Sequence, residues 1–138
     1  MWESKSSWSH ANLSSLAKEE DIVTEMARLE SALLTTIGKF PTYMRPPYLL
    51  CNAQCLQTMD KLGYHVVHTD LETADWKGSV SDSKEIVDAA IAASDPASKS
   101  FITLAHDVYK TTVTKLAKHM IKSFKNEGYT FTTVGQCL

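Results

Sequence analysis

The sequence lacks any apolar run approaching the ~18 residues that a membrane-spanning helix requires. Its first residues, 1–5, lead into serine and histidine rather than into the apolar stretch of a secretion signal. Basic clusters are lacking too, because 14 Lys and Arg are balanced by 16 Asp and Glu, for a net charge of -2. As written, the chain is predicted neither to span a membrane nor to carry its own secretion signal. Nucleic acids and anionic membrane surfaces are not expected partners.

Internal repeats of the kind that build a solenoid are absent, and so are low-complexity segments. Hydrophobic residues form 43% of the chain and charged residues 22%, values of a globular protein rather than a disordered one. A chain of 138 residues is one domain or a piece of one. Such a chain can bury roughly two-thirds of its unfolded surface.

Cysteine is scarce and odd in number, with three residues. Cys51 and Cys55 lie four positions apart, close enough on one helical face to form a disulfide if the first turn is slightly distorted. Cys137 is then left over. The odd count fits either a reduced cytosolic protein or an oxidised protein whose remaining partner cysteine lies outside this chain.

Apolar residues at three- and four-residue steps predict helices over 13–37, 52–62, 82–94 and 113–127. Each helix is followed by a run with strand composition, over 42–44, 64–69, 101–105 and 129–134. Asn52 is expected to cap the second helix, and Asp82 with Glu85 to form a capping box on the third. The run 101–105 is almost continuously apolar, as expected for a strand buried on both faces of a parallel sheet.

Strict alternation of helices and strands predicts an α/β fold with a parallel sheet, either doubly wound or part of a β/α barrel. A complete barrel needs about 250 residues, so four helix–strand units amount to about half of one. Reactive residues of such sheets gather where the strands end, and the candidates here are expected at one rim. They are His10 before the first helix, Arg45 after the first strand, Asp75 and Trp76 after the second, and His106 and Asp107 after the third.

Four short motifs resemble, in order, those of the polysaccharide deacetylases, the NodB-homology domain of carbohydrate esterase family 4, with the nearest likeness to fungal chitin deacetylases. They are Ser7-Trp8-Ser9-His10-Ala11-Asn12-Leu13, Arg45-Pro46-Pro47-Tyr48, Asp75-Trp76 and Leu104-Ala105-His106. The resemblance covers essentially the whole chain. It implies a partial (β/α) barrel, with residues 1–138 forming the C-terminal portion of the domain. It also implies a secreted or cell-wall hydrolase of the amide C–N bonds in N-acetylglucosamine polymers such as chitin.

The resemblance implies a divalent metal, usually zinc, held by one Asp and two His, with a metal-bound water that attacks the N-acetyl carbonyl. His10 corresponds to the second metal-binding His, and His106 to the general acid that protonates the leaving nitrogen. The other implied roles are orientation of His106 by Asp75, retention of the catalytic Asp by Arg45, oxyanion stabilisation by the Tyr48 backbone N–H, and lining of the acetate pocket and the sugar groove by Leu104 and Trp76.

The chain departs from the family pattern at the metal site. Ser6 stands where the family has its first metal His, and Glu72 where the fourth motif usually begins with Asp. The Asp-Asp motif that supplies the metal carboxylate and the general base has no counterpart. One of three ligands remains, so we expect that the chain alone does not bind zinc usefully. The resemblance also implies a local Cys51–Cys55 disulfide and, for Cys137, a partner in an N-terminal half.

Two functions remain open. The chain can be a piece of a deacetylase whose site is complete only with an N-terminal half. It can instead be a pseudoenzyme that binds chitin oligosaccharides through Tyr48, Trp76 and Leu104 without cleaving them. The open strand edges of a half barrel also predict self-association.

Simpler structural roles compete with these assignments. His10 can be a surface histidine, Arg45 the partner of a surface carboxylate, and His106 or Trp76 a core residue. Another alternative is a zinc site built from Cys51, Cys55, His65 and His68. It is disfavoured because an odd offset points two strand side chains to opposite faces. His119, on the last helix, is expected to be solvated.

Overall fold

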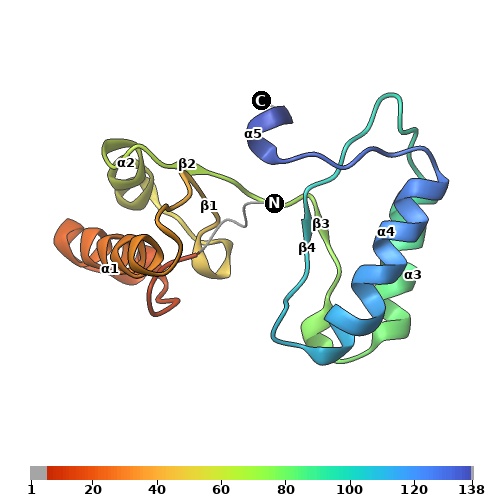
Figure 1. Ribbon diagram of the computed structural model, residues 1–138, viewed down its shortest axis with the longest axis horizontal. Coiled ribbons are helices and arrows are strands. Elements are labelled where there is room, and N and C mark those ends of the chain that lie inside the picture. Colours follow the sequence, from red (N-terminus) through yellow and green to blue (C-terminus); the bar gives the residue numbers. More distant parts are fainter. Residues whose placement is uncertain (1–5, 138) are drawn as a thin grey trace. The chain divides into compact units, whose positions relative to one another are not determined.

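The computed structural model describes residues 6–137, which form two compact units (Figure 1). The first unit comprises the chain through His68 together with the stretch from Thr133 onward, and the second unit is Thr69–Thr132. The expectation about a secretion signal rests on residues 1–5, which lie outside the described residues. Within 6–137, no helix combines the length and the apolar character needed to cross a bilayer.

The first unit begins with a short 3₁₀ turn, η1 (Leu13–Ser15), and a long helix, α1 (Glu19–Ile37). The helix expected over 13–37 therefore starts later, because Leu16 is extended and separates the turn from the helix. Three acidic residues in the first turn of α1 favour its N-terminal dipole. Gly38 closes α1 in the left-handed conformation and donates its N–H to the Leu34 carbonyl.

Two short strands of the first unit, β1 (Tyr43–Met44) and β2 (His65–Val66), pair in parallel, with Tyr43 opposite His65. They are connected through η2 (Pro47–Leu49) and α2 (Ala53–Lys61), and the helix α5 (Val134–Cys137) completes the unit. The parallel pairing expected from the alternation is confirmed. Buried side chains from η1, α1, β1 and α2 form one core, namely Leu13, Ile22, Met26, Met44, Cys55 and Met59, together with Tyr64.

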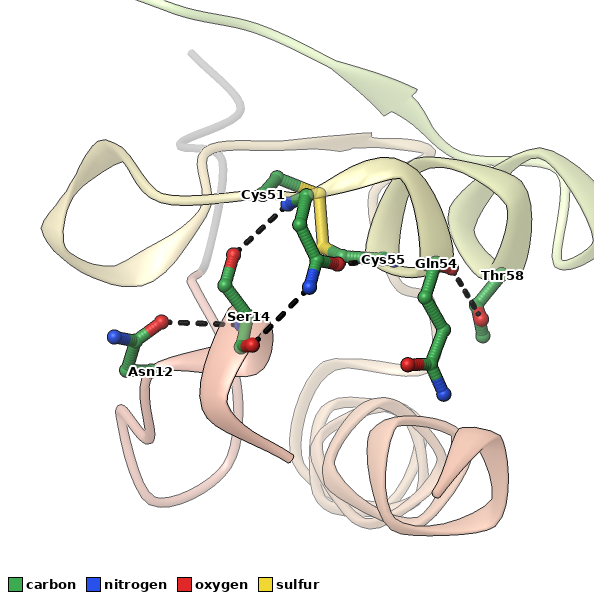
Figure 2. Close-up of a disulfide and its surroundings, with 7 residues drawn as sticks. Asn12, Ser14, Cys51, Gln54, Cys55 and Thr58 are labelled. Atoms are coloured by element: carbon green, nitrogen blue, oxygen red, sulfur yellow. Dashed lines mark hydrogen bonds between the residues drawn. A yellow bond between two sulfur atoms is a disulfide. The ribbon is translucent and has the colours of Figure 1, made fainter. Parts of the chain in front are cut away.

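The predicted cap of α2 is confirmed, since the Asn52 side chain accepts a hydrogen bond from the Cys55 N–H. Asn52 also donates its backbone N–H to Ser14 Oγ (2.8 Å) and its amide to the Ser14 carbonyl (3.1 Å). Figure 2 shows Ser14 beside the Cys51–Cys55 disulfide at the start of α2. The segment that follows His10 is thus fastened to α2.

The second unit contains a second parallel pair, β3 (Leu71–Glu72) with β4 (Thr103–Leu104). A 3₁₀ turn, η3 (Asp75–Lys77), and the helix α3 (Val80–Ala92) connect the strands, and β4 leads into a π-helical turn, η4 (Thr112–Leu116), and the helix α4 (Ala117–Asn126). Helices α3 and α4 run side by side (Figure 1). Leu71, Val87, Ile91 and Phe124 form the core of this unit.

Three local expectations for the second half of the chain are wrong: the cap of α3, the extent of the strand over 101–105, and the strand over 129–134. Ser79, not an Asp82–Glu85 capping box, caps α3, because its hydroxyl accepts the Asp82 N–H at 3.2 Å. Only two residues of 101–105 form a strand, and they are half-buried, because β4 pairs with one strand rather than two.

The run 129–134 forms no strand, because its aromatic rings pack against α4 instead of entering a ladder. Tyr129 and Phe131 lie edge-on to Phe124, with centroids 5.2 and 6.3 Å away. Four helix–strand units are therefore not formed. Among residues 6–137 the strands make two separate two-stranded sheets, so the fold is α/β with short parallel sheets. The (β/α) barrel stays a prediction.

Candidate functional site

The predicted site residues are divided between the two units. His10, Arg45 and Tyr48 belong to the first unit. Asp75, Trp76, Leu104 and His106 belong to the second.

Asp75 and His106 form the tightest polar pair at the end of the second parallel sheet. Asp75 opens the turn that follows β3, and His106 lies two residues beyond β4. Because the two strands are parallel, their carboxyl ends bring these residues together. His106 donates its backbone N–H to Asp75 Oδ2, and its Nδ1 lies 2.7 Å from Oδ1. The Asp75 side chain is 3% exposed and that of His106 is 39% exposed.

The environment of Asp75 keeps its carboxylate ionised. Burial acts to raise the pKa of Asp75, but hydrogen bonds from the backbone and ring of His106 and from Thr112 outweigh it, and the pKa lies below its ordinary value of 3.8. An ionised carboxylate only accepts hydrogen bonds, so His106 Nδ1 is the donor in this pair. The other ring nitrogen, Nε2, takes no part in this pair.

Trp76 and Leu104 flank this pair in sequence. Trp76 is 52% exposed, and its Nε1 donates to Glu72 Oε1 at 3.0 Å. The alternative interpretation of Trp76 as a core residue is therefore wrong. Leu104 is half-buried on β4, where its carbonyl accepts the Thr73 hydroxyl at 2.9 Å.

In the first unit, His10 and Tyr48 pack edge-to-face, with ring centroids 5.1 Å apart. Both residues adopt the left-handed backbone conformation, with φ of 59° and 56°, and both are exposed, Tyr48 to 66%. Residues other than glycine rarely adopt this strained conformation, and in other proteins they cluster at functional sites. The Pro-Pro-Tyr turn is closed by the N–H groups of Leu49 and Leu50, which bond to the carbonyls of the two prolines.

Arg45 follows β1 and is half-buried. Its Nε is buried without a hydrogen-bond partner among residues 6–137, and burial lowers its pKa from the ordinary value of an arginine. No charged group of the described residues contributes to this shift, and the role of Arg45 stays a prediction. The guanidinium borders a cavity of about 330 Å³ in the first unit, whose other lining residues include Lys39, Tyr43, Val67 and Gly135.

The donors of the described residues do not fit a three-ligand metal centre. No group of three or more His, Cys, Asp or Glu side chains within 6–137 converges in a way that could hold an ion. His10 contributes one imidazole, and its ring lies against Tyr48 rather than beside another ligand. No chemical step is therefore assigned to a metal.

Comparison with known proteins accounts for this set of residues. The sequence model of the polysaccharide deacetylase family matches residues 4–67. The chain contains part of a polysaccharide deacetylase domain. It is 40% identical over 131 residues to a chitin deacetylase of Pestalotiopsis sp, an alignment that covers 95% of this chain and 43% of the relative. A chitin deacetylase of Colletotrichum lindemuthianum is 36% identical over 135 residues, covering 95% of this chain and 54% of the relative.

The solved structure of the chitin deacetylase from the fungal pathogen Colletotrichum lindemuthianum superposes on this chain with a TM-score of 0.88 at 37% identity. The superposition covers 94% of this chain and 58% of that one. The resemblance to fungal chitin deacetylases is thus confirmed. The chain spans about half the length of the curated relatives it matches, and the roles of single residues stay predictions.

The local Cys51–Cys55 disulfide that the family resemblance implies is confirmed, and the partner of Cys137 stays a prediction. Cys51 and Cys55 form a disulfide with a Cα–Cα distance of 5.2 Å, and Cys137 is an exposed free thiol. The alternative interpretation, a zinc site that uses Cys51 and Cys55, is therefore wrong, because both sulfurs are bonded to each other. His65 instead stacks on Tyr43, with ring centroids 4.9 Å apart.

Two polar contacts of the second unit were missed by sequence reasoning. His119 is partly rather than fully exposed, and its Nε2 lies 2.8 Å from Asp88 Oδ1, a contact that joins α4 to α3. Thr112 donates its hydroxyl to Asp75 Oδ2 at 2.7 Å. No local sequence signal marks either contact, since each joins residues more than thirty positions apart.

Proposed function

We propose that the chain supplies the proton-donating half of a deacetylase that acts on chitin or related N-acetylglucosamine oligosaccharides. The Asp75–His106 pair at the end of the parallel β3–β4 sheet is the observation that carries the proposal. Similarity to chitin deacetylases over 95% of the chain supports the substrate class.

Hydrolysis of an N-acetyl group cleaves the amide C–N bond, and the nitrogen must take up a proton as it leaves. In the proposal, protonated His106 donates that proton from Nε2, the ring nitrogen not bound to Asp75. The buried Asp75 carboxylate holds the ring in one orientation and stabilises its positive charge. Leu104 would contact the acetyl methyl, and the half-exposed indole of Trp76 would offer a flat face to the sugar.

The proposal also includes three residues of the first unit, in the roles that the family resemblance implies. The backbone N–H of Tyr48 would stabilise the oxyanion, and Arg45 would hold the carboxylate of the general base. His10 would be one of three metal ligands. Neither the base carboxylate nor the other two ligands is supplied by the described residues.

Acetate release from N-acetylglucosamine oligomers tests the deacetylase, measured for the 138-residue chain and for a His106→Asn variant, with zinc binding followed by calorimetry. Acetate release that requires His106 supports the proposal. Release that is unchanged in His106→Asn overturns the general-acid role. Tight one-to-one zinc binding would overturn the conclusion that the donors do not fit.

A glycan-binding protein without catalysis is the second candidate. The lack of a three-donor cluster among residues 6–137 favours it, together with the exposed rings of Tyr48 and Trp76. It predicts that oligomers bind the chain without acetate release and that Trp76→Ala weakens the binding. Acetate release would rule this candidate out.

The disulfide supports an oxidising location, either secreted or in the cell wall, because cytosolic thiols are kept reduced. Self-association remains part of the proposal, since each two-residue strand of the described chain pairs with one neighbour only. Sedimentation of the purified chain would reveal it, and a monodisperse monomer would contradict it.

A further inference from the structure

Three hydrogen bonds fix the carboxylate of Asp75, and one of them comes from outside the Asp75–His106 pair. Oδ1 faces the ring nitrogen Nδ1 of His106 at 2.7 Å. Oδ2 accepts both the His106 backbone N–H and the Thr112 hydroxyl, each at 2.7 Å. The hydrogen bond between Thr112 and Asp75 is buried, because both residues are only 5% exposed.

The Thr112 hydroxyl bonds differently from the hydroxyls of five other helical threonines in the described chain. In an ordinary helix the hydroxyl bonds to the carbonyl four residues earlier. Five other helical threonines of the described chain follow this rule, at 2.7–2.8 Å: Thr24, Thr35, Thr36, Thr58 and Thr114.

Thr112 stands at the start of a π-helical turn, but the turn alone does not divert its hydroxyl, because Thr114 in the same turn bonds to the Lys110 carbonyl. Thr112 opens η4, which spans Thr112–Leu116. A π turn takes one residue more than an α turn and occurs often at functional sites. Here the turn coincides with the point at which the threonine hydroxyl reaches across to the η3 segment and bonds to Asp75.

We propose that Thr112 is a positioning residue that sets the rotation of the Asp75 carboxylate and, through it, the orientation of the His106 ring. The inference deepens the proposed function, on which its catalytic meaning rests. The terminal torsion of an aspartate is broad, so a carboxylate held at one oxygen only can turn. Thr112 and the His106 backbone together hold Oδ2, which keeps Oδ1 on Nδ1 and leaves Nε2 for the substrate.

The electrostatics agree with this geometry. The Thr112 hydroxyl is one of the donors that, against burial, hold the pKa of Asp75 below its ordinary value. Removing that donor removes part of the stabilisation of the ionised carboxylate.

The test compares Thr112→Val, which lacks the hydroxyl, with Thr112→Ser, which keeps it, in the 138-residue chain. Thr114→Val is the matched control, because its hydroxyl bonds within its own helix and is exposed. Nitrogen NMR reports the tautomer of His106, and carbon NMR follows the titration of the Asp75 carboxyl. If Thr112→Val fails to fold, Thr112→Ala is used, which removes the same hydroxyl without adding volume.

We expect the hydroxyl-free variant to raise the pKa of Asp75 and to turn a single Nδ1–H tautomer of His106 into a mixture. The serine variant and Thr114→Val should match the parent chain. A variant without the hydroxyl that keeps both signals overturns the positioning role.

The catalytic arm of the test is separate. Where acetate release is measurable, the hydroxyl-free variant should lower kcat by about tenfold or more with little change in KM, as supporting residues around a catalytic group do. An unchanged kcat would overturn the proposal. Acetate release that does not need His106 would overturn the proposed general-acid function, whereas the NMR signals decide the role of Thr112 independently.

Discussion

Glu25 accepts two hydrogen bonds of 2.8 Å from Ser9, one from the backbone N–H and one from the hydroxyl. The neighbouring Trp8 donates its N–H to the Glu25 carbonyl, and its ring lies 4.9 Å from the Arg28 guanidinium. These contacts fasten the residues immediately before His10 to α1. The position of His10 thus depends on one carboxylate in the middle of a helix.

Replacement of Glu25 by Ala should destabilise this attachment. The two bonds are exposed, so we expect a loss of about 1 kcal/mol in the free energy of unfolding, measured in urea. Glu20→Ala, on the exposed face of the same helix, is the control and should change stability less. Equal effects of the two substitutions would show that Glu25 acts only through helix propensity.

Glu25 also predicts a pH dependence. Burial acts to raise its pKa, but hydrogen bonds from Ser9 dominate, and the pKa lies below the ordinary value of 4.5. A lowered pKa in the folded state means that the stabilisation is complete above about pH 4.5 and is lost as the pH falls through the folded-state value. Glu25→Gln should reduce the loss of unfolding free energy at acid pH, measured by urea unfolding at a series of pH values. The same fall in unfolding free energy with pH in the variant and in the parent chain would contradict the prediction.

Asp75→Asn should weaken the second unit more than a surface substitution does. An amide nitrogen in place of Oδ1 or Oδ2 would face donors where the carboxylate accepts three hydrogen bonds. Leaving such a buried donor unsatisfied costs about 1–3 kcal/mol. Asp107→Asn, at an exposed neighbouring position, is the matched control and should be nearly neutral. Thermal unfolding of the two variants makes the comparison, and similar midpoints would count against the inferred role of Asp75.

Arg45→Met should leave stability unchanged or increase it. The buried Nε has no hydrogen-bond partner among the described residues, so its removal relieves a desolvation cost. Arg28→Met is the control with the opposite sign, because it removes a cation–π contact of about 0.5–1 kcal/mol at an exposed site. A marked loss of stability in Arg45→Met would mean that the guanidinium has a structural role.

The parts of the fold that were predicted correctly depend on short-range chemistry. Asn52 was identified as a cap because its side chain needs only the N–H groups of the next turn. The run 129–134 was mistaken for a strand because its aromatic rings pack on Phe124, a partner that strand composition does not reveal.

The candidate site likewise has a part that could be predicted from the sequence and a part that could not. Motif order located Asp75 and His106, and the parallel strands bring them together. Thr112 and the partner of His119 could not be predicted, because a hydroxyl or imidazole on a helix carries no sign of the residue it meets on another element. The π turn at Thr112 is a backbone feature with no known sequence signature to search for.

The disulfide predicts a simple pattern of thiol reactivity. Before reduction, an alkylating reagent should modify Cys137 alone, and after reduction of the unfolded chain it should modify all three cysteines. The loop that Cys51 and Cys55 close is short, so its loss should cost about 2 kcal/mol of stability. Mass spectrometry of the parent chain checks the alkylation pattern. Urea unfolding of a Cys51→Ser, Cys55→Ser double variant checks the loss of stability. Cys137→Ser is the control and should unfold like the parent chain.

Gly135 of α5 meets Tyr43 of β1 so closely that an added Cβ would lie 3.2 Å from the tyrosine ring. Both residues belong to the first unit, yet the whole second unit, Thr69–Thr132, lies between them along the chain. The second unit is in this sense an insertion into the first. Synthesis runs from the N-terminus, so the ribosome releases Thr69–Thr132 before Gly135 emerges. The contact of α5 with Tyr43 therefore cannot form in a newly made chain until the whole second unit has been synthesised.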